Sequence, residues 1–203
     1  MTVKLYVEGG GDSEALHSEC RRGFRLFLEK AGLEGYMPRI VACGGRQVAY
    51  DRFRTACRAN ERALLLLDSE MPVADTSPWA FLESRDGFRP PVGVADAQCH
   101  LMVVCMESWF LADRKSMNEF FGQGFNEKAL PQNITVEAVS KHDVYSGFQR
   151  ASAGCKTKAP YGKGEHSFKI LARVDPRKVC DASPWAKRFL DEVNRFMKEA
   201  RKR

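Results

Sequence analysis

The sequence contains no apolar run that is long enough to span a bilayer. Its longest apolar stretches, 63–67 and 101–106, have the length of a strand, whereas a membrane-spanning helix needs about 20 apolar residues. The chain begins with a short apolar stretch that passes into glycines and acids, which does not resemble a signal peptide. We therefore expect a cytoplasmic protein that makes no membrane contact.

Paired cysteine motifs are also missing. The chain has 7 cysteines, an odd number, and no two of them have CxxC spacing. This pattern argues against a zinc ribbon and against a disulfide framework, and it favours reduced thiols. A nucleophilic cysteine stays open as an alternative, although free cysteines are usually buried.

The charge balance is moderately basic. Lys and Arg number 32 against 26 Asp and Glu, which gives a net charge of +6. Such an excess permits a polyanionic partner such as DNA or RNA without requiring one. Many of the basic residues lie between the acidic segments 8–14 and 68–70 or in the last quarter of the chain.

Apolar runs and helical periodicities alternate along the first half of the chain. Predicted strands cover 3–7, 38–43, 63–67 and 100–105, and predicted helices cover 14–32, 47–60, 116–121 and 185–200. This order predicts a three-layer α/β/α fold with a mostly parallel sheet. We expect 1–115 to form a metal-binding core and 116–203 a small C-terminal extension packed on it, either within the same domain or as a small lobe. Within that extension, we expect 122–164 to form loops and short elements over the site, followed by a strand around Phe168.

Three of the predicted strands end in acidic residues. Glu8 follows the first strand, Asp68 and Glu70 follow the third, and Glu107 follows the fourth. Sites in parallel sheets form beyond the carboxyl ends of the strands, and carboxylates crowded there need a cation between them. Oxygen ligands of this kind suit Mg²⁺ or Mn²⁺. The alternative for each acid is that it only caps the helix that follows.

Glycines 9–11 follow the first strand directly. Glycine lets the backbone approach a phosphate group at the start of a helix. The run lacks the Lys-Ser/Thr of a P-loop and does not fit the dinucleotide-binding fingerprint.

The segment EGGGDSE at 8–14, followed later by DSE at 68–70, resembles the Toprim pattern of topoisomerases, primases and overcoming-lysogenisation-defect (OLD) nucleases. In that pattern a Glu after the first strand is followed by DxD after a later strand. Glu8 and Asp68 match, whereas Glu70 replaces the second Asp. The resemblance covers about the first 115 residues and implies a Toprim-like fold.

A closer resemblance, over nearly the whole chain, is to small stand-alone Toprim-like bacterial proteins of the domain-of-unknown-function family DUF4276. ESWFLAD at 107–113 is similar to that family's second motif, and YGKGEHSFKIL at 161–171 is similar to its third. The resemblance implies a partner ATPase of the AAA or ABC type, encoded nearby, and a role in phage defence.

The resemblance also implies roles for individual residues. Glu8 is expected to act as general acid/base or metal ligand, Asp68 and Glu70 as ligands, and Glu107 as a further ligand. Lys163 is expected to stabilise developing charge, and His166 to carry a proton or to be only a packed polar residue. The candidates for binding phosphate or nucleic acid are Gly10, Gly11, Arg46 and Lys158.

Three functions follow as hypotheses. The first is a Mg²⁺- or Mn²⁺-dependent nuclease that cleaves or nicks DNA or RNA. The second is a non-catalytic, nucleic-acid-binding or regulatory subunit of an ATPase, and the third is a phosphoesterase that acts on small molecules. A topoisomerase and a primase are disfavoured, because 203 residues leave no room for the additional domains that these enzymes need.

Overall fold

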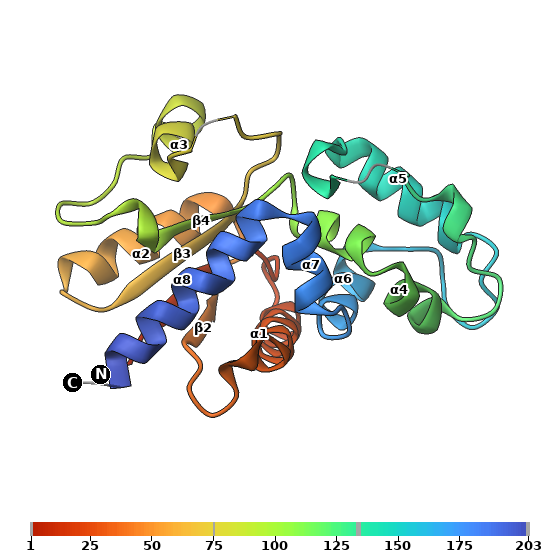
Figure 1. Ribbon diagram of the computed structural model, residues 1–203, viewed down its shortest axis with the longest axis horizontal. Helices are drawn as coiled ribbons and strands as arrows, with labels where there is room; N and C mark the ends of the chain where they lie inside the picture. Colours follow the sequence, from red (N-terminus) through yellow and green to blue (C-terminus); the bar gives the residue numbers. More distant parts are fainter. Residues whose placement is uncertain (1, 75, 133–134, 202–203) are drawn as a thin grey trace.

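The computed structural model describes residues 2–74, 76–132 and 135–201. Its strands are β1 (Lys4–Val7), β2 (Arg39–Ala42), β3 (Ala63–Asp68) and β4 (Cys99–Met102). They form one sheet in the order β2-β1-β3-β4, and every pair is parallel. The predicted three-layer α/β/α fold with a parallel sheet is confirmed (Figure 1).

β3 lies inside the sheet between β1 and β4, and all of its residues are buried. A strand covered on both faces needs apolar side chains on both, which explains the continuous run of leucines. Leu64 of β3 lies beside Leu5 of β1, which in turn lies beside Ile40 of β2. This register brings the ends of β1 and β3, and thus Glu8 and Asp68, to the same edge of the sheet.

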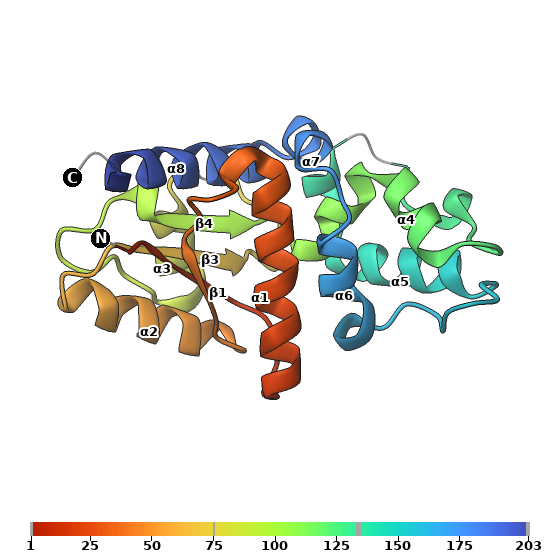
Figure 2. The same cartoon turned by 90° about the horizontal axis from the view of Figure 1, so that it is seen from below.

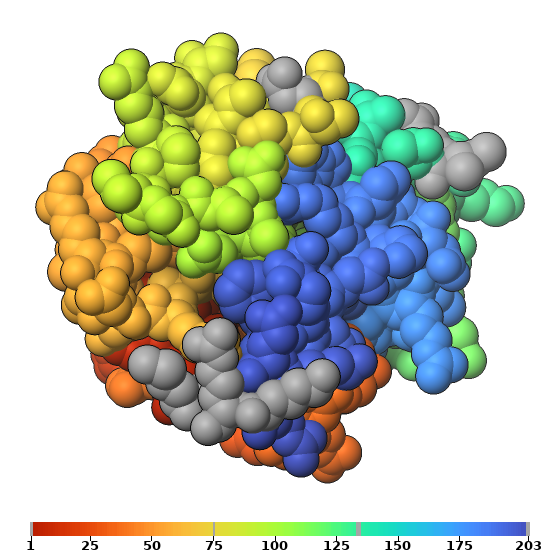
Figure 3. Space-filling model, turned by 60° about the vertical axis from the view of Figure 1, so that its left-hand side comes forward, coloured from red at the N-terminus to blue at the C-terminus, as the bar shows by residue number. Residues whose placement is uncertain are grey.

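Two aromatic clusters mark the helical layers. On one side, Trp109 stacks on Phe27 of α1 (Glu14–Leu28) and on Phe189 of α8 (Pro184–Arg201). On the other side, Trp79 of α3 (Pro78–Asp86) packs on Phe53 of α2 (Arg46–Arg58). The helices α8 and α2 accordingly lie on opposite sides of the strands in Figure 2. In the space-filling view, α8 (blue) lies between the yellow-green segment that leads into β4 and the orange segment after α1 (Figure 3).

Further helices lie beyond the carboxyl ends of the strands (Figures 1 and 2). The short helix Met106–Ala112 leads to α4 (Arg114–Phe121) and α5 (Lys141–Ser152), which lie to the side of the sheet. α6 (Lys163–Leu171) packs along α1, and α7 (Pro176–Ala182) leads into α8. The predicted extension 116–203 therefore has two parts. α4 and α5 lie beyond the carboxyl ends of the strands, whereas α6 and α8 pack on the core.

Two local predictions differ from the structure. The segment 122–164 was expected to form loops and short elements, and it contains the three-turn helix α5, whose first turn is capped by the Ser140 side chain. Phe168 was expected in a strand, yet it lies in α6. Both segments bury one face of a helix against distant parts of the chain, which local composition does not indicate.

No described helix is both long and apolar enough to cross a bilayer.

Candidate metal centre

Three acidic residues meet at the carboxyl edge of the sheet. One carboxylate oxygen from each of Glu8, Asp68 and Glu70 lies within 4.8 Å of the others. Glu8 follows β1, Asp68 ends β3, and Glu70 lies two residues further on in a left-handed backbone conformation (φ 69°). The parallel pairing of β1 and β3 is what places these residues together.

Glu8 and Asp68 are tied to each other through the backbone. The Asp68 N–H donates to Glu8 Oε2 at 3.1 Å, and the Met106 N–H donates to Asp68 Oδ1 at 2.8 Å. Glu8 Oε1 and Asp68 Oδ2 accept no hydrogen bond from any described residue. Each of these two acids therefore keeps one oxygen available to a ligand.

Burial makes the charges of Glu8 and Asp68 costly. Asp68 is 5% exposed, and burial, followed by the charges of Glu8 and Glu107, raises its pKa well above the usual range. Burial also raises the pKa of Glu8, against the opposing effect of the Arg46 guanidinium. A cation placed between them would favour the ionised form of both.

Two basic side chains already contact this group. Arg46, at the start of α2, lies 3.3 Å from Glu8 Oε2 and donates to the Asp68 carbonyl oxygen at 2.6 Å. Lys141, at the start of α5, donates to Glu70 Oε1 at 2.6 Å. The sequence predicted that Arg46 would contact phosphate; in the structure it supports Glu8 and the end of β3. Lys141 was missed, because nothing local relates it to an acid 71 residues away.

Glu107 is held in a different way. It is fully buried and accepts hydrogen bonds from Tyr145 at 2.9 Å, Ser167 at 2.9 Å and Tyr161 at 3.3 Å. The structure thus places it beside the acidic group, in a set of hydroxyl donors, and not among the three converging carboxylates. Burial and the Glu107 charge raise the pKa of both tyrosines, so they remain protonated donors.

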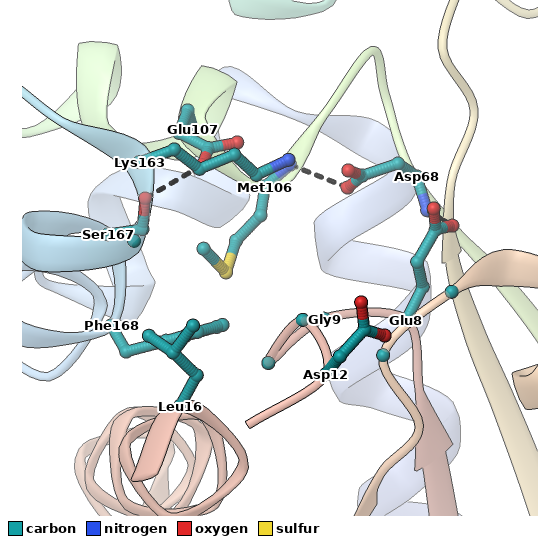
Figure 4. A pocket seen from close by; sticks show the side chains of 15 residues that line it. Glu8, Gly9, Asp12, Leu16, Asp68, Met106, Glu107, Lys163, Ser167 and Phe168 are labelled. Atoms are coloured by element: carbon teal, nitrogen blue, oxygen red, sulfur yellow. Dashed lines mark hydrogen bonds between the residues drawn. The ribbon is translucent and has the colours of Figure 1, made fainter. Parts of the chain in front are cut away.

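A cavity of about 440 Å³ opens next to the acids (Figure 4). Glu8 and Asp68 line one side of it, Glu107 and Lys163 the other, and Phe168 closes it toward α1. Burial would lower the pKa of Lys163, but the charges of Glu107 and Asp68 outweigh this effect and hold it above the ordinary value. Lys163 therefore remains a cation in this cavity.

The glycine loop forms the floor of the cavity, where Gly10 and Gly11 have positive φ angles of 94° and 52°. A Cβ atom on Gly10 would lie 2.7 Å from the His17 ring, so a side chain does not fit there. Ser13 caps α1 by accepting from the Leu16 N–H. The predicted glycine loop thus leads into the start of α1 at the acidic cavity.

His166 and Lys158 lie elsewhere. His166 is buried among Phe120, Phe121 and Tyr161, and its Nδ1 accepts from the Gly162 N–H at 3.0 Å. Both His166 and Lys158 line a second cavity, between α1 and α6, and not the acidic one. The structure therefore does not bring either residue to the three carboxylates.

A family model described as "Domain of unknown function (DUF4276)" matches residues 7–194. The chain belongs to this family. The match includes the acids at both strand ends, the segment 107–113 and the start of α6, so the DUF4276 region contains the whole acidic cavity. No match was found among curated proteins or among solved structures.

Proposed function

We propose that this DUF4276 protein is a Mg²⁺- or Mn²⁺-dependent nuclease that hydrolyses phosphodiester bonds in DNA or RNA. The observation that carries the proposal is the convergence of Glu8, Asp68 and Glu70. One carboxylate oxygen of each lies within 4.8 Å of the others, and Glu8 and Asp68 line the cavity. Three carboxylates with this spacing are a donor set for a hard divalent cation. The proposal includes a relationship to the Toprim domains of OLD-family nucleases.

The residues present fit such a cation. Glu8 and Asp68 each keep one oxygen without a hydrogen bond from the described residues, and burial of Asp68 favours a positive neighbour. Glu8, Asp68 and Glu70 would hold the ion, with Lys141 releasing at least one oxygen of Glu70. When bound, the cation supplies a polarised phosphate oxygen and an activated water.

The chain's own groups favour a phosphate in this cavity. α1 and α6 both begin there, and the start of a helix attracts anions. Lys163 adds a full positive charge on the side opposite Glu8 and would stabilise the charge that develops on the phosphate. Gly10 and Gly11 line this cavity with backbone atoms alone.

Substitution of Asp68 tests the proposal. Asp68→Asn keeps the shape of the side chain and its hydrogen bond from Met106 but removes the ligand charge. We expect cleavage of DNA or RNA with Mn²⁺ to fall by at least roughly a hundredfold, because the metal supplies several kcal/mol of transition-state stabilisation. The matched control is Asp191→Asn on the exposed face of α8, which should retain full activity. Full cleavage by folded Asp68→Asn would refute the proposal.

A second candidate is a non-catalytic subunit that binds nucleic acid or regulates an AAA- or ABC-type ATPase. The ion pairs of Arg46 with Glu8 and of Lys141 with Glu70 favour it, since they neutralise two of the three acids within the protein. Its expected result is binding of nucleic acid without cleavage, both alone and with the ATPase. Turnover of nucleotides or small phosphodiesters without cleavage of polymers would instead indicate a small-molecule phosphoesterase.

A further inference from the structure

The second cavity, of about 500 Å³, lies in the groove between α1 and α6. Both helices run from the acidic cavity into this groove: Leu16 and Lys163 line the first cavity, and Arg22 and Lys169 line the second. Phe168 lines both and therefore stands between them. The two cavities therefore lie one after the other along the α1–α6 pair, and Figures 1 and 2 show α6 beside α1.

Four basic residues line this second cavity without acidic partners. They are Arg22, Lys158, Lys169 and Arg173. None of them forms an ion pair with another described residue, whereas their neighbours Arg21 and Arg25 on α1 pair with Glu14 and Glu29. Two acids, Glu19 and Glu165, also line the cavity, so its net charge is positive. Unpaired cations gathered in a concave site attract a polyanion.

The floor of the groove is built from His166 and Phe120. His166 Nδ1 accepts from the Gly162 N–H, so the ring proton of the neutral imidazole is on Nε2, which lies 3.5 Å from Glu165 Oε1. Phe120 is 5% exposed and lies between Lys158 and Arg173, whose charged groups are 5.0 Å and 5.5 Å from its ring centre. The ring therefore holds the two cations in place and is not available for stacking with a base.

We propose that this groove binds the phosphate backbone of the nucleic-acid strand that enters the acidic cavity. The proposal rests on the proposed function, because it extends the path of the same substrate. Leu16 and Gly23 are seven residues apart on α1, or about 10 Å at the rise of a helix, which corresponds to about three nucleotides along one strand of a duplex. Contacts from Lys158, Lys169, Arg22 and Arg173 are to phosphate, so binding in the groove is independent of sequence.

Binding is measured in the Asp68→Asn background with EDTA, by anisotropy of fluorescent oligonucleotides, both single-stranded and duplex. The groove variant is Lys158→Ala with Lys169→Ala. Its control is Lys187→Ala with Lys198→Ala on α8, which removes the same charge elsewhere. Thermal melting establishes that both variants are folded.

We expect the groove variant to bind about fivefold to tenfold more weakly, and the slope of log affinity against log salt to fall by about 1.4 for a single strand. The control should bind like the parent protein. Equal binding by all three proteins, or equal losses in both variants, would overturn the proposal. The binding assay requires no cleavage, so binding of DNA or RNA in the groove can be established even if the nuclease proposal fails. Conversely, if the protein cleaves nucleic acid but the groove variant binds like the parent, the nuclease proposal stands and the groove proposal fails.

Discussion

At the scale of single residues, the buried carboxylates differ in what surrounds them. Glu107 accepts hydrogen bonds from three hydroxyls, whereas Asp68 accepts one from a backbone N–H and faces two other acids. A carboxylate that is surrounded by donors is stabilised without a cation, whereas the pKa of Asp68 is raised by burial and by its acidic neighbours, and a bound cation would favour its ionised form. Substitution of Glu107 is therefore expected to have a different effect from substitution of one of the three converging acids.

Substitution of Glu70 should weaken Mn²⁺ binding more than substitution of Glu107. Glu70→Gln removes one of the three converging carboxylates, and we expect the affinity to fall by about tenfold or more. Glu107→Gln alters a residue outside that group, and its effect on affinity should be clearly smaller. Isothermal titration calorimetry measures both. A larger loss of affinity for Glu107→Gln would indicate that Glu107, and not Glu70, binds the ion together with Asp68.

Gly10 is the glycine for which the loop leaves no room for a side chain. Gly10→Ala should lower the free energy of unfolding by about 2 kcal/mol, because the new Cβ atom meets His17 at 2.7 Å and φ is positive. The matched control is Gly35→Ala, which has a similar φ of 79° but nothing within 4 Å of its Cβ. Urea unfolding should show a loss of only about 1 kcal/mol for that control; equal losses would contradict the close packing of the glycine loop.

The sequence predicted Glu8, Asp68 and Glu70 as a group because acids after parallel strands must lie at one edge. It placed Glu107 there by the same strand-end argument, whereas His166 and Lys158 were assigned only through the family resemblance. Lys163, His166 and Ser167 belong to one motif, yet successive side chains of a helix point in different directions. Lys163 and Ser167, four residues apart, face the acidic cavity, whereas His166 faces the groove.

At the scale of secondary-structure elements, α8 is held on β4 through His100. His100 Nδ1 accepts from Arg188 at 3.3 Å, and its ring packs on Phe189. Burial, together with the Arg188 charge, lowers the pKa of His100 to about 3. The folded protein therefore requires a neutral imidazole at this contact.

The stability of the protein should depend on pH through His100. In the unfolded chain the pKa of His100 is about 6.5, so below that pH the unfolded chain binds a proton that the folded protein does not. The free energy of unfolding therefore decreases as the pH falls from 6.5 toward 3. The loss from this group is about 1.4 kcal/mol per pH unit. Urea unfolding of the wild type and His100→Gln, compared at about pH 7.5 and about pH 5.5, isolates it. If the two proteins lose the same stability on acidification, His100 is not the group responsible.

The elements of the sheet could be predicted because each strand is a short apolar run ended by glycine or acid. The helices α5 and α6 could not, because their buried faces are completed by partners from elsewhere. Phe148 of α5 packs on Phe110, and Phe168 of α6 closes on Gly23 of α1, where a Cβ atom would lie 2.7 Å from the Phe168 carbonyl oxygen. No window of local sequence contains both members of either pair.

At the scale of the whole molecule, the candidate site lies where the sheet meets the helices beyond its edge. β1 and β3 supply the acids, α2 supplies Arg46, α5 supplies Lys141, and α6 supplies Lys163. The alternation of strands and helices predicted the parallel sheet that brings the acids to one edge. The pairing of Lys141 with Glu70, which are far apart in sequence, could not be predicted. The account as a whole depends on one cation being bound where the acids from β1 and β3 meet.

The most direct measurement is the anomalous scattering of Mn²⁺ in a crystal of the protein. The account predicts one strong peak coordinated by oxygens of Glu8, Asp68 and Glu70, with Lys141 withdrawn from at least one oxygen of Glu70. The contradicting result is a well-ordered map at high Mn²⁺ concentration with no peak there, in which Arg46 and Lys141 keep their contacts with Glu8 and Glu70.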